Sequence, residues 1–365
     1  MEDAVFMGPA FMRSYAAPVE APQTNLGIVL ASRSMQLELE TPNCDLCGHA
    51  GQRNLFPVKD RRYGNPGEFH LVECERCRLR YLSPRPVAST IHAWYPDDYR
   101  AYRAPTRSAV DGVKDFFDEL WNQYLRRFLS DSYPIYYFAE RAAELARPGQ
   151  PPRILDVGCG SGYKLAYVQR HGGWETHGVD FNAQAVENAR ARGADVHLST
   201  GDRLPFPDDY FDAVMSWHSL EHHYSPKATM NEVMRVLRPG GYGIFAVPSG
   251  DSLGLRIFRS YWGPLEAPRH LYHFSKETLT RLIEETGLRV QKVFHDFSFY
   301  GLFLDEEIFD SLEYMARDFG LPVRLPRLFG LSSAARIPVL FANEALGRLW
   351  RGTNLIFHFQ KPFLA

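Results

Sequence analysis

The sequence predicts an α/β fold in which helices cover both faces of a mostly parallel sheet. From residue 153 onward, short β-branched and apolar runs alternate with stretches of helical periodicity. Continuous apolar runs of this length are typical of strands that are buried on both faces. The expected strands are ILDV (154–157), THGVD (176–180), DVHLS (195–199), FDAVMSW (211–217) and GYGIFAVP (241–248). The helices between them are YKLAYVQRHG (163–172), NAQAVENARARG (182–193) and SPKATMNEVMRVLRPGG (225–241). Doubly wound sheets of this kind bind ligands beyond the carboxyl ends of their strands.

Composition favours a large globular core and argues against a protein built mainly to hold nucleic acid. The chain has 365 residues, of which 45% are hydrophobic and 23% charged, and its formal net charge is -2. That length suggests roughly two domains, and a charge near zero provides no global cationic field. Residues 1–18 contain no apolar segment typical of a secretion signal, and nowhere do about 18 apolar residues run together. We therefore expect a cytoplasmic protein without a membrane span, and leave open whether it forms a homodimer.

A glycine-rich turn follows the first expected strand, in the stretch ILDVGCGSGYKL (154–165). Such a turn exposes backbone N–H groups and lets a nucleoside-bearing ligand approach the main chain. The spacing is G-x-G-x-G, whereas the dinucleotide fingerprint is G-x-G-x-x-G. Asp180 closes the second strand, where a carboxylate can accept hydrogen bonds from ribose hydroxyls. Asp202 follows the third strand, where it can meet the exocyclic amine of an adenine.

Four of the five cysteines form two C-x-x-C pairs, Cys44 with Cys47 and Cys74 with Cys77. Each short loop directs two sulfurs toward one point, so in a chain without a secretion signal the pattern favours a tetrahedral zinc site over disulfides. The residues between the pairs alternate as strands do around a Gly-Asn-Pro-Gly turn, which predicts a hairpin. A shell closed by four thiolates has no position for substrate, so we expect Zn²⁺ to be structural. Unmetallated or redox-active thiols are the alternative.

The chain divides into four expected parts. They are an N-terminal arm (1–40), a zinc-binding module (41–86), a helical bridging segment (87–150) and the ligand-binding α/β domain (151–365). Within the last part, residues 297–350 form a helical insertion that is longer than a connection between neighbouring strands needs. This insertion either covers the sheet edge, or serves as a lid over an apolar acceptor or as a surface for a dimer or carrier.

Five motifs, in this order, carry a resemblance: LDVGCGSG, VDFN, GDRLPFPDDYFDAV, HSLEHH and LRPGGYGIFAVP. With them the chain resembles the class I S-adenosylmethionine-dependent methyltransferases. The resemblance implies S-adenosyl-L-methionine as cofactor and a Rossmann-like seven-stranded sheet whose last strand is antiparallel. LRVQKVFHD (288–296) and NLIFHFQKP (354–362) would be its final two strands. A four-cysteine module joined to this core resembles enzymes that modify small molecules such as natural products, sugars or glycan precursors.

The same resemblance assigns cofactor-binding roles by position. The glycine turn and Asp156 would hold the methionine part, Asp180 the ribose, and Asp202 with the backbone of Arg203 the adenine. The full set is Asp156, Gly158, Gly160, Gly162, Asp180, Phe181, Asp202, Arg203, Trp217 and His218. Alternatively, Asp180 is an acid at a helix N-terminus and Asp202 belongs to a turn.

Histidines are the candidate bases. Methyl transfer from a sulfonium is an in-line displacement, so the protein must position the acceptor and, for a hydroxyl or carbon acid, remove a proton. Histidine is best matched to that task near neutral pH. We expect His222 and His273 to form a catalytic pair, with Trp217, His270 and Tyr272 lining the site of a small-molecule acceptor.

Other functions remain open at this point. The zinc module could instead dock RNA or protein for methylation, or the chain could be a noncatalytic cofactor-binding scaffold. A dehydrogenase is a further alternative, which the glycine spacing disfavours. Neither the acceptor nor the methylated atom, whether O, N or C, follows from these patterns.

Overall fold

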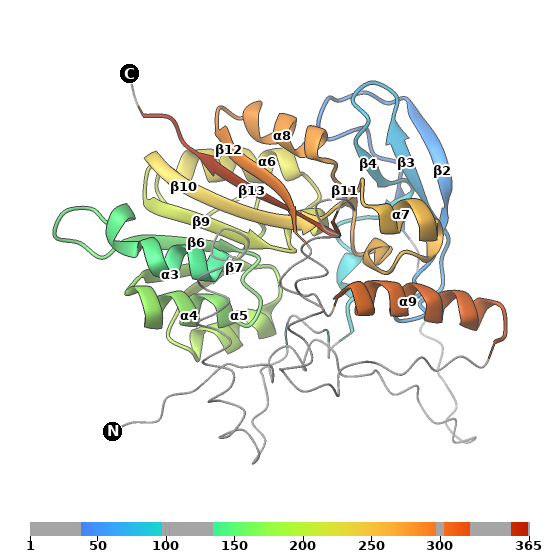
Figure 1. Cartoon of the computed structure of the whole chain (residues 1–365), viewed down its shortest axis with the longest axis horizontal. Helices are drawn as coiled ribbons and strands as arrows, with labels where there is room; N and C mark the ends of the chain where they lie inside the picture. Colours follow the sequence, from blue (N-terminus) through green and yellow to red (C-terminus); the bar gives the residue numbers. More distant parts are fainter. Residues whose placement is uncertain are drawn as a thin grey trace, which may run out of the picture.

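The computed structural model describes residues 38–96, 99, 102, 134–296, 303–321 and 352–363, and these contain a seven-stranded sheet of order β12-β13-β10-β9-β6-β7-β8 (Figure 1). Its strands are β6 (Arg153–Val157), β7 (Glu175–Asp180), β8 (Asp195–Leu198), β9 (Phe211–Trp217), β10 (Leu237–Pro248), β12 (Arg289–Asp296) and β13 (Asn354–Gln360). Strands β6 to β10 are parallel, whereas β13 is antiparallel to both β10 and β12. The predicted Rossmann-like sheet is therefore confirmed.

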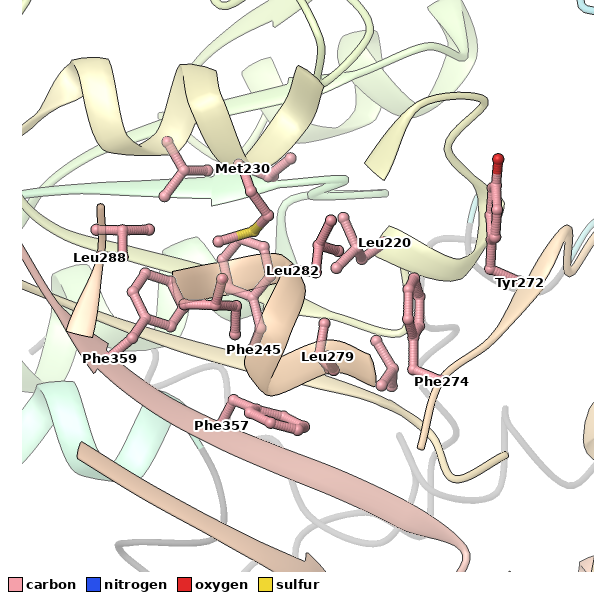
Figure 2. Packing of buried hydrophobic residues seen from close by; sticks show 14 of the residues in the cluster. Leu220, Met230, Phe245, Tyr272, Phe274, Leu279, Leu282, Leu288, Phe357 and Phe359 are labelled. Atoms are coloured by element: carbon pink, nitrogen blue, oxygen red, sulfur yellow. The ribbon is translucent and has the colours of Figure 1, made fainter. Parts of the chain in front are cut away.

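Helices cover both faces of this sheet (Figure 1). They are α3 (Pro134–Leu145), α4 (Tyr163–Gly172) and α5 (Ala183–Arg190) on one face, and α6 (Pro226–Val236) and α8 (Lys276–Glu284) on the other. Successive strand residues point to opposite faces, so Ile244 of β10 packs with the α3–α5 side and Phe245 with the α6–α8 side. Figure 2 shows Phe245 with Met230 and Leu282 in the hydrophobic cluster on the α6–α8 side of the sheet. Both faces of the sheet are thus removed from water.

One helix end differs from expectation. Ser225 caps α6 as its motif indicates, with its hydroxyl accepting from the N–H of Ala228. The helix ends at Val236, because Leu237 already pairs with Phe211 of the neighbouring strand. Gly240, at the end of the helical stretch expected over 225–241, therefore lies inside β10 with a φ of 77°.

A second sheet, of order β11-β4-β3-β2, contains strands of residues 41–86, the segment that is expected to bind zinc and is called the zinc module below. Its strands are β2 (Gln52–Val58), β3 (Phe69–Cys74), β4 (Arg80–Leu82) and β11 (Tyr272–His273). The fourth strand comes from the α/β domain, and Tyr272 pairs with Tyr81 while His273 pairs with Arg80. A further short pair joins β1 (Leu39–Glu40) to β5 (Arg85–Pro86). The module and the α/β domain therefore share one sheet.

Short helices and α9 lie near the second sheet, and Figure 1 shows α7 beside this sheet and α9 below it. They are η1 (Ile91–Trp94), η3 (Leu220–His222), α7 (Leu253–Phe258), η4 (Arg259–Tyr261), η5 (Gly263–Leu265) and α9 (Phe303–Asp318). Helix α9 lies within the segment 297–350, where a helical insertion is expected, and contacts α7, η4 and η5. Two further helical patterns, at 111–129 in the bridging segment and at 338–352 in the insertion, lie outside the described residues, except for Gly352. Nearly all of the N-terminal arm also lies outside them. Among the described helices, none has both the length and the apolarity that a bilayer crossing requires.

Candidate active site

A cavity of about 450 Å³ lies at the carboxyl ends of β6, β7 and β9, on the side that faces the zinc-binding module. Its lining includes the glycine turn and Asp180 at one end, and His218, His222 and His270 at the other. Arg62 and Tyr63, from the loop between β2 and β3, also line it. The volume falls within the range of small-molecule sites, roughly 300–1,000 Å³. One continuous cavity, partly open to solvent, therefore joins the predicted cofactor residues to the histidines.

The glycine turn needs glycine for two separate reasons. Gly158, Gly160 and Gly162 all have positive φ, of 78°, 54° and 75°, a region that side chains disfavour. A Cβ on Gly158 would lie 1.9 Å from the Oγ of Ser219, and one on Gly162 would lie 2.6 Å from the Cβ of Ala189. Gly158 and Gly160 line the cavity, whereas Gly162 begins α4 and packs on α5. The turn thus presents bare backbone to the cavity.

Asp180 is held in one orientation at the end of β7. Its Oδ2 accepts from the N–H of Gly160 at 2.8 Å and its Oδ1 from the N–H of Asn182 at 2.9 Å. Burial raises the pKa of Asp180, and these two backbone donors oppose the rise. Each oxygen keeps a further acceptor site, so the carboxylate can receive two ligand hydroxyls. Asn182 caps α5 through Ala185, so the helix start and the carboxylate position are coupled.

Asp156 lies beneath the turn and does not line the cavity. Among the described residues neither of its carboxylate oxygens accepts a hydrogen bond, and the Nζ of Lys164 is 4.0 Å from Oδ2. Burial raises the pKa of Asp156 to about 6. Because Lys164 does line the cavity, any influence of Asp156 on a ligand passes through the turn or through this lysine.

Of the remaining predicted cofactor residues, some line the cavity and one does not. Asp202 is exposed and lines the cavity, whereas Arg203 does not line it and donates its backbone N–H to Thr200. Phe181 lines the cavity with 41% of its surface exposed. Trp217 and His218 line it from the end of β9.

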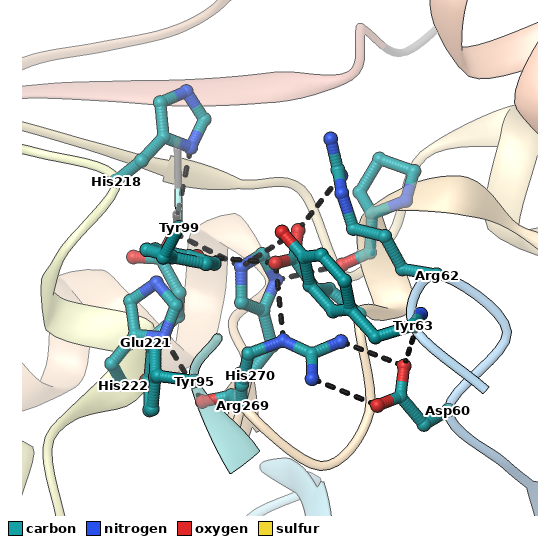
Figure 3. Close-up of polar contacts among 12 residues, drawn as sticks. Asp60, Arg62, Tyr63, Tyr95, Tyr99, His218, Glu221, His222, Arg269 and His270 are labelled. Carbon is teal, nitrogen blue, oxygen red and sulfur yellow. Dashed lines mark hydrogen bonds and ion pairs between the residues drawn. The ribbon is translucent and has the colours of Figure 1, made fainter. Parts of the chain in front are cut away.

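The Glu221 group, defined here as Glu221 with His218, His222 and His270, lies at the cavity wall, and Figure 3 shows its four side chains close to one another. Glu221 is fully buried beneath the three histidines, which line the cavity. The Nδ1 of His218 lies 3.4 Å from Oε1 of Glu221, and the Nε2 of His270 lies 4.0 Å from it. Burial would raise the pKa of Glu221, but these imidazoles lower it to about 2. Burial, together with His222, lowers the pKa of His270 to about 4.

Backbone carbonyls determine the tautomers of two of these histidines. Nδ1 of His270 lies 2.8 Å from the carbonyl oxygen of Pro264, and Nδ1 of His222 lies 3.0 Å from that of Arg269. A carbonyl oxygen only accepts, so Nδ1 carries the proton in each neutral ring and Nε2 keeps its lone pair. The Tyr95 hydroxyl also lies 3.0 Å from Nδ1 of His222. The hydrogen bonds at Nδ1 therefore fix the orientation of both imidazole rings.

A buried ionic network supports the group from the zinc module. Arg269 and Asp60 are both fully buried and pair through two hydrogen bonds (Figure 3). Glu266 accepts from Arg62 and from Arg269, and Arg62 holds the pKa of Glu266 well below its usual range despite its burial. These contacts fix the loop whose carbonyls orient His222 and His270.

Aromatic rings close the cavity between its two ends. Tyr95 contacts Phe181 with ring centroids 5.4 Å apart, and Tyr99 with centroids 4.9 Å apart. Tyr102 joins the same cluster, at 5.1 Å from Tyr99. Burial raises the pKa values of all three tyrosines, so they are neutral near pH 7. The wall is thus apolar in character, with hydroxyl groups at intervals.

Two residues expected at the acceptor site lie elsewhere. His273 sits on β11, is 1% exposed and does not line the cavity, and neither of its ring nitrogens has a hydrogen-bond partner among the described residues. Tyr272 also lies outside the lining, where it donates to the carbonyl of Tyr224 and accepts from Arg85. Both residues belong to β11, which pairs with β4 of the second sheet, and neither side chain lines the cavity. The structure therefore does not bring His222 and His273 together at the cavity.

Sequence reasoning did not single out several residues of the site. Glu221 stands within the HSLEHH motif, but its burial could be recognised only once the fold was known. Tyr95, Tyr99 and Arg62 reach the cavity from the segment before the α/β domain. That segment has no local motif that marks them, although its density of tyrosines was a usable signal.

The four cysteines are brought together as their spacing predicts. The Sγ atoms of Cys44 and Cys77 are 3.4 Å apart, and those of Cys47 and Cys74 are 3.6 Å apart. All four sulfurs lie within 4.8 Å of one another, and all are free thiols rather than disulfides. Burial raises the pKa of Cys77 to about 11. Cys159 is separate from the four: it is buried within the glycine turn and lines the cavity.

Comparison with known proteins agrees with this arrangement. A family model described as a methyltransferase domain matches residues 125–293. A Mycolicibacterium smegmatis protein named "probable S-adenosylmethionine-dependent methyltransferase" is 33% identical over 150 residues, which are 39% of this chain and 55% of that protein. The demethylmenaquinone methyltransferase of Thermus thermophilus is 35% identical over 158 residues, covering 40% of this chain and 71% of that enzyme.

The chain belongs to the S-adenosylmethionine-dependent methyltransferases. The fatty-acid O-methyltransferase of Mycolicibacterium smegmatis is 36% identical over 118 residues, 31% of this chain and 42% of that enzyme. The chain thus spans about half of the length of two of these three relatives. The matched region contains the glycine turn, Asp180 and the Glu221 group.

Proposed function

We propose that this methyltransferase transfers the methyl group of S-adenosylmethionine to a small-molecule acceptor with an ionisable proton. One observation carries the proposal: a single cavity connects Asp180 and the glycine turn to the histidines of the Glu221 group. The relatives named for fatty acids and demethylmenaquinone support a small acceptor. So does the cavity volume of about 450 Å³, which suits a compact ligand better than a polymer.

The cofactor end of the cavity fits S-adenosylmethionine. The exposed backbone of Gly158 and Gly160 would face the methionine part, and the two oriented oxygens of Asp180 would accept from the ribose hydroxyls. Asp202 would meet the adenine, and Trp217 would lie near the sulfonium. When bound, the cofactor supplies an electrophilic methyl group, and the electrons of the broken S–C bond stay on sulfur.

Within the Glu221 group, we assign removal of the acceptor proton to His218. Nδ1 of His218 lies 3.4 Å from Oε1 of Glu221, so Nε2 is the ring nitrogen that we assign as the base. The His218 side chain is 30% exposed and lines the cavity, so an acceptor can reach it. His222, the base favoured by the sequence, would instead face the acceptor with a ring oriented by Arg269 and Tyr95. His273 takes no part in this proposal because it lies outside the cavity.

The cysteine quartet is proposed to bind one structural Zn²⁺. Zinc–thiolate bonds of about 2.3 Å in a tetrahedron place sulfurs about 3.8 Å apart, close to the 3.4 and 3.6 Å of the two pairs in the structure. The shell would be closed, so the ion would stabilise the module and take no part in methyl transfer. The module would then hold Arg62, Tyr63 and Asp60 in position for the cavity.

The function can be tested with cell extract as the acceptor source. Extract is divided into small-molecule, RNA and protein fractions, and each is incubated with enzyme and labelled S-adenosylmethionine. Release of S-adenosylhomocysteine with the small-molecule fraction alone is expected. Labelling of the RNA or protein fraction instead would point to a macromolecular substrate docked by the zinc module. Cofactor binding without turnover on any fraction would favour a noncatalytic scaffold.

A further inference from the structure

We propose that Glu221, His222 and His270 bind a divalent first-row transition-metal ion at the acceptor end of the cavity. Nothing in the family comparison assigns an ion to these residues. The site lies at the acceptor end of the proposed methyltransferase cavity, so a role of the ion in catalysis rests on the proposed function. Metal binding itself can be measured without methyl transfer.

Geometry is the first support. One ring nitrogen of each histidine and one carboxylate oxygen of Glu221 lie within 4.8 Å of one another. The three residues come from η3 and from the loop before β11, which are joined by the N–H of Leu271 donating to the carbonyl of Glu221 at 2.8 Å. Metal–ligand bonds of about 2.0–2.2 Å would require these side chains to close in by about 1 Å, without a change of backbone.

The tautomers are the second support. Metal-binding histidines usually donate their second ring N–H to a carbonyl or carboxylate, which orients the ring and leaves the other nitrogen for the metal. His222 and His270 both do this, through the carbonyls of Arg269 and Pro264. Each therefore keeps an unprotonated Nε2. Two such rings beside one buried carboxylate form a 2-His-1-carboxylate set.

The charge balance of Glu221 is the third support. Glu221 is fully buried, and neither carboxylate oxygen accepts a hydrogen bond of good geometry from any described residue. No lysine or arginine in the described part of the chain pairs with it. The nearest arginines are committed elsewhere, Arg62 to Glu266 and Arg269 to Asp60. A buried carboxylate without a cation is costly, and a metal ion would balance it.

The proposed ion indicates which chemical class of acceptor the site would bind. Three protein ligands leave coordination positions open toward the cavity, because His222 and His270 line it. An acceptor hydroxyl or enol oxygen bound there would lose its proton more readily. The proton passes to Nε2 of His218, the oxygen lone pair forms the new O–CH₃ bond, and the S–CH₃ bond breaks with its electrons remaining on sulfur. The acceptor would thus be methylated on oxygen.

The test uses the full chain as purified, with its cysteine site loaded with zinc. Mn²⁺ is the probe because thiolate sites disfavour it, whereas imidazole and carboxylate ligands accept it. Titration calorimetry and water-proton relaxation should show one Mn²⁺ bound per chain. Glu221→Gln and His270→Gln should each weaken Mn²⁺ binding by more than about 100-fold, since changes behind the ligands alone cost roughly 10–100-fold. His197→Gln, a change at a half-exposed histidine on β8, is the matched control and should bind Mn²⁺ like the parent.

Two results would overturn the inference. One is a parent protein that binds S-adenosylmethionine but no Mn²⁺, which leaves the proposed methyltransferase function intact. The other is unchanged Mn²⁺ affinity in Glu221→Gln and His270→Gln, with folding of each variant verified by circular dichroism. Should one variant fail to fold, the other decides. Conversely, Mn²⁺ binding without binding of S-adenosylmethionine would count against the proposed function and not against the metal site.

Discussion

Arg269 and Asp60 form a fully buried pair in which two guanidinium nitrogens donate to the two carboxylate oxygens at 2.9 and 2.8 Å. Asp60 belongs to the zinc module, while the carbonyl of Arg269 orients His222. Asp60 is further fixed by the N–H of Tyr63 and by Asn65. The pair therefore links the folding of the module to the geometry of the active site.

The first prediction concerns this pair. Asp60→Asn removes the buried carboxylate that pairs with two guanidinium nitrogens of Arg269 and leaves Glu266 as the remaining partner, so the free energy of unfolding should fall by about 3–5 kcal/mol. Urea unfolding at neutral pH measures the loss. The control is Arg281→Ala, which breaks the exposed pair with Glu285 and should cost less than about 1 kcal/mol. If both changes lowered the free energy of unfolding equally, the buried pair would stabilise the protein no more than an exposed one.

The second prediction concerns the cofactor. Asp180→Ala removes an oriented acceptor of two ribose hydroxyls, so S-adenosylmethionine binding should weaken by on the order of 2–4 kcal/mol. Titration calorimetry provides the measurement. Glu187→Gln, on the exposed face of the helix that follows, is the control and should bind as the parent does. If Asp180→Ala retained parental affinity, the carboxylate would not be the ribose ligand.

The third prediction concerns zinc. Protein purified without added metal should contain about one zinc per chain, measured by elemental analysis. Cys74→Ser should lose that zinc and unfold at a lower temperature, whereas Cys159→Ser should retain it because Cys159 lies apart from the quartet. A folded parent protein free of metal would contradict the assignment.

The fourth prediction concerns proton transfer. His218→Gln should lower turnover by about 100-fold or more while the affinity for S-adenosylmethionine stays close to that of the parent. Both are measured with the small-molecule fraction as acceptor source and by calorimetry. His197→Gln again serves as control. Parental turnover in His218→Gln would indicate an acceptor that is already nucleophilic at neutral pH.

The fifth prediction concerns pH and stability. Burial lowers the pKa of His273 to about 3, below the usual value of about 6.5, so the unfolded chain binds the proton more readily in this window. Its contribution to stability is therefore complete above pH 6.5 and is lost as pH falls toward 3. In His273→Leu, the loss of stability between pH 7 and pH 5 should be smaller by about 2 kcal/mol. Urea unfolding at both pH values gives the slopes, and equal slopes in parent and variant would refute the prediction.

Local patterns sufficed for the elements of the α/β domain. The strands and α4 to α6 follow apolar runs and helical periodicity, and the cysteine quartet follows from two short loops. The parts that escaped prediction depend on long-range contacts. Strand β11 has two residues, too few for any period, and it draws His273 away from the cavity that His270 lines. The burial of Glu221 and Arg269 likewise results from packing between segments that are far apart in the chain.

The sharing of one sheet by the zinc module and the α/β domain has a consequence during synthesis. Strand β4 remains an edge strand until Tyr272 and His273 are available to pair with it, and exposed edge strands invite pairing with other chains. While the ribosome makes the residues in between, the emerging module cannot complete its sheet. A nascent chain is therefore most prone to aggregate in this interval, and a fragment that ends at residue 86 carries the same open edge permanently.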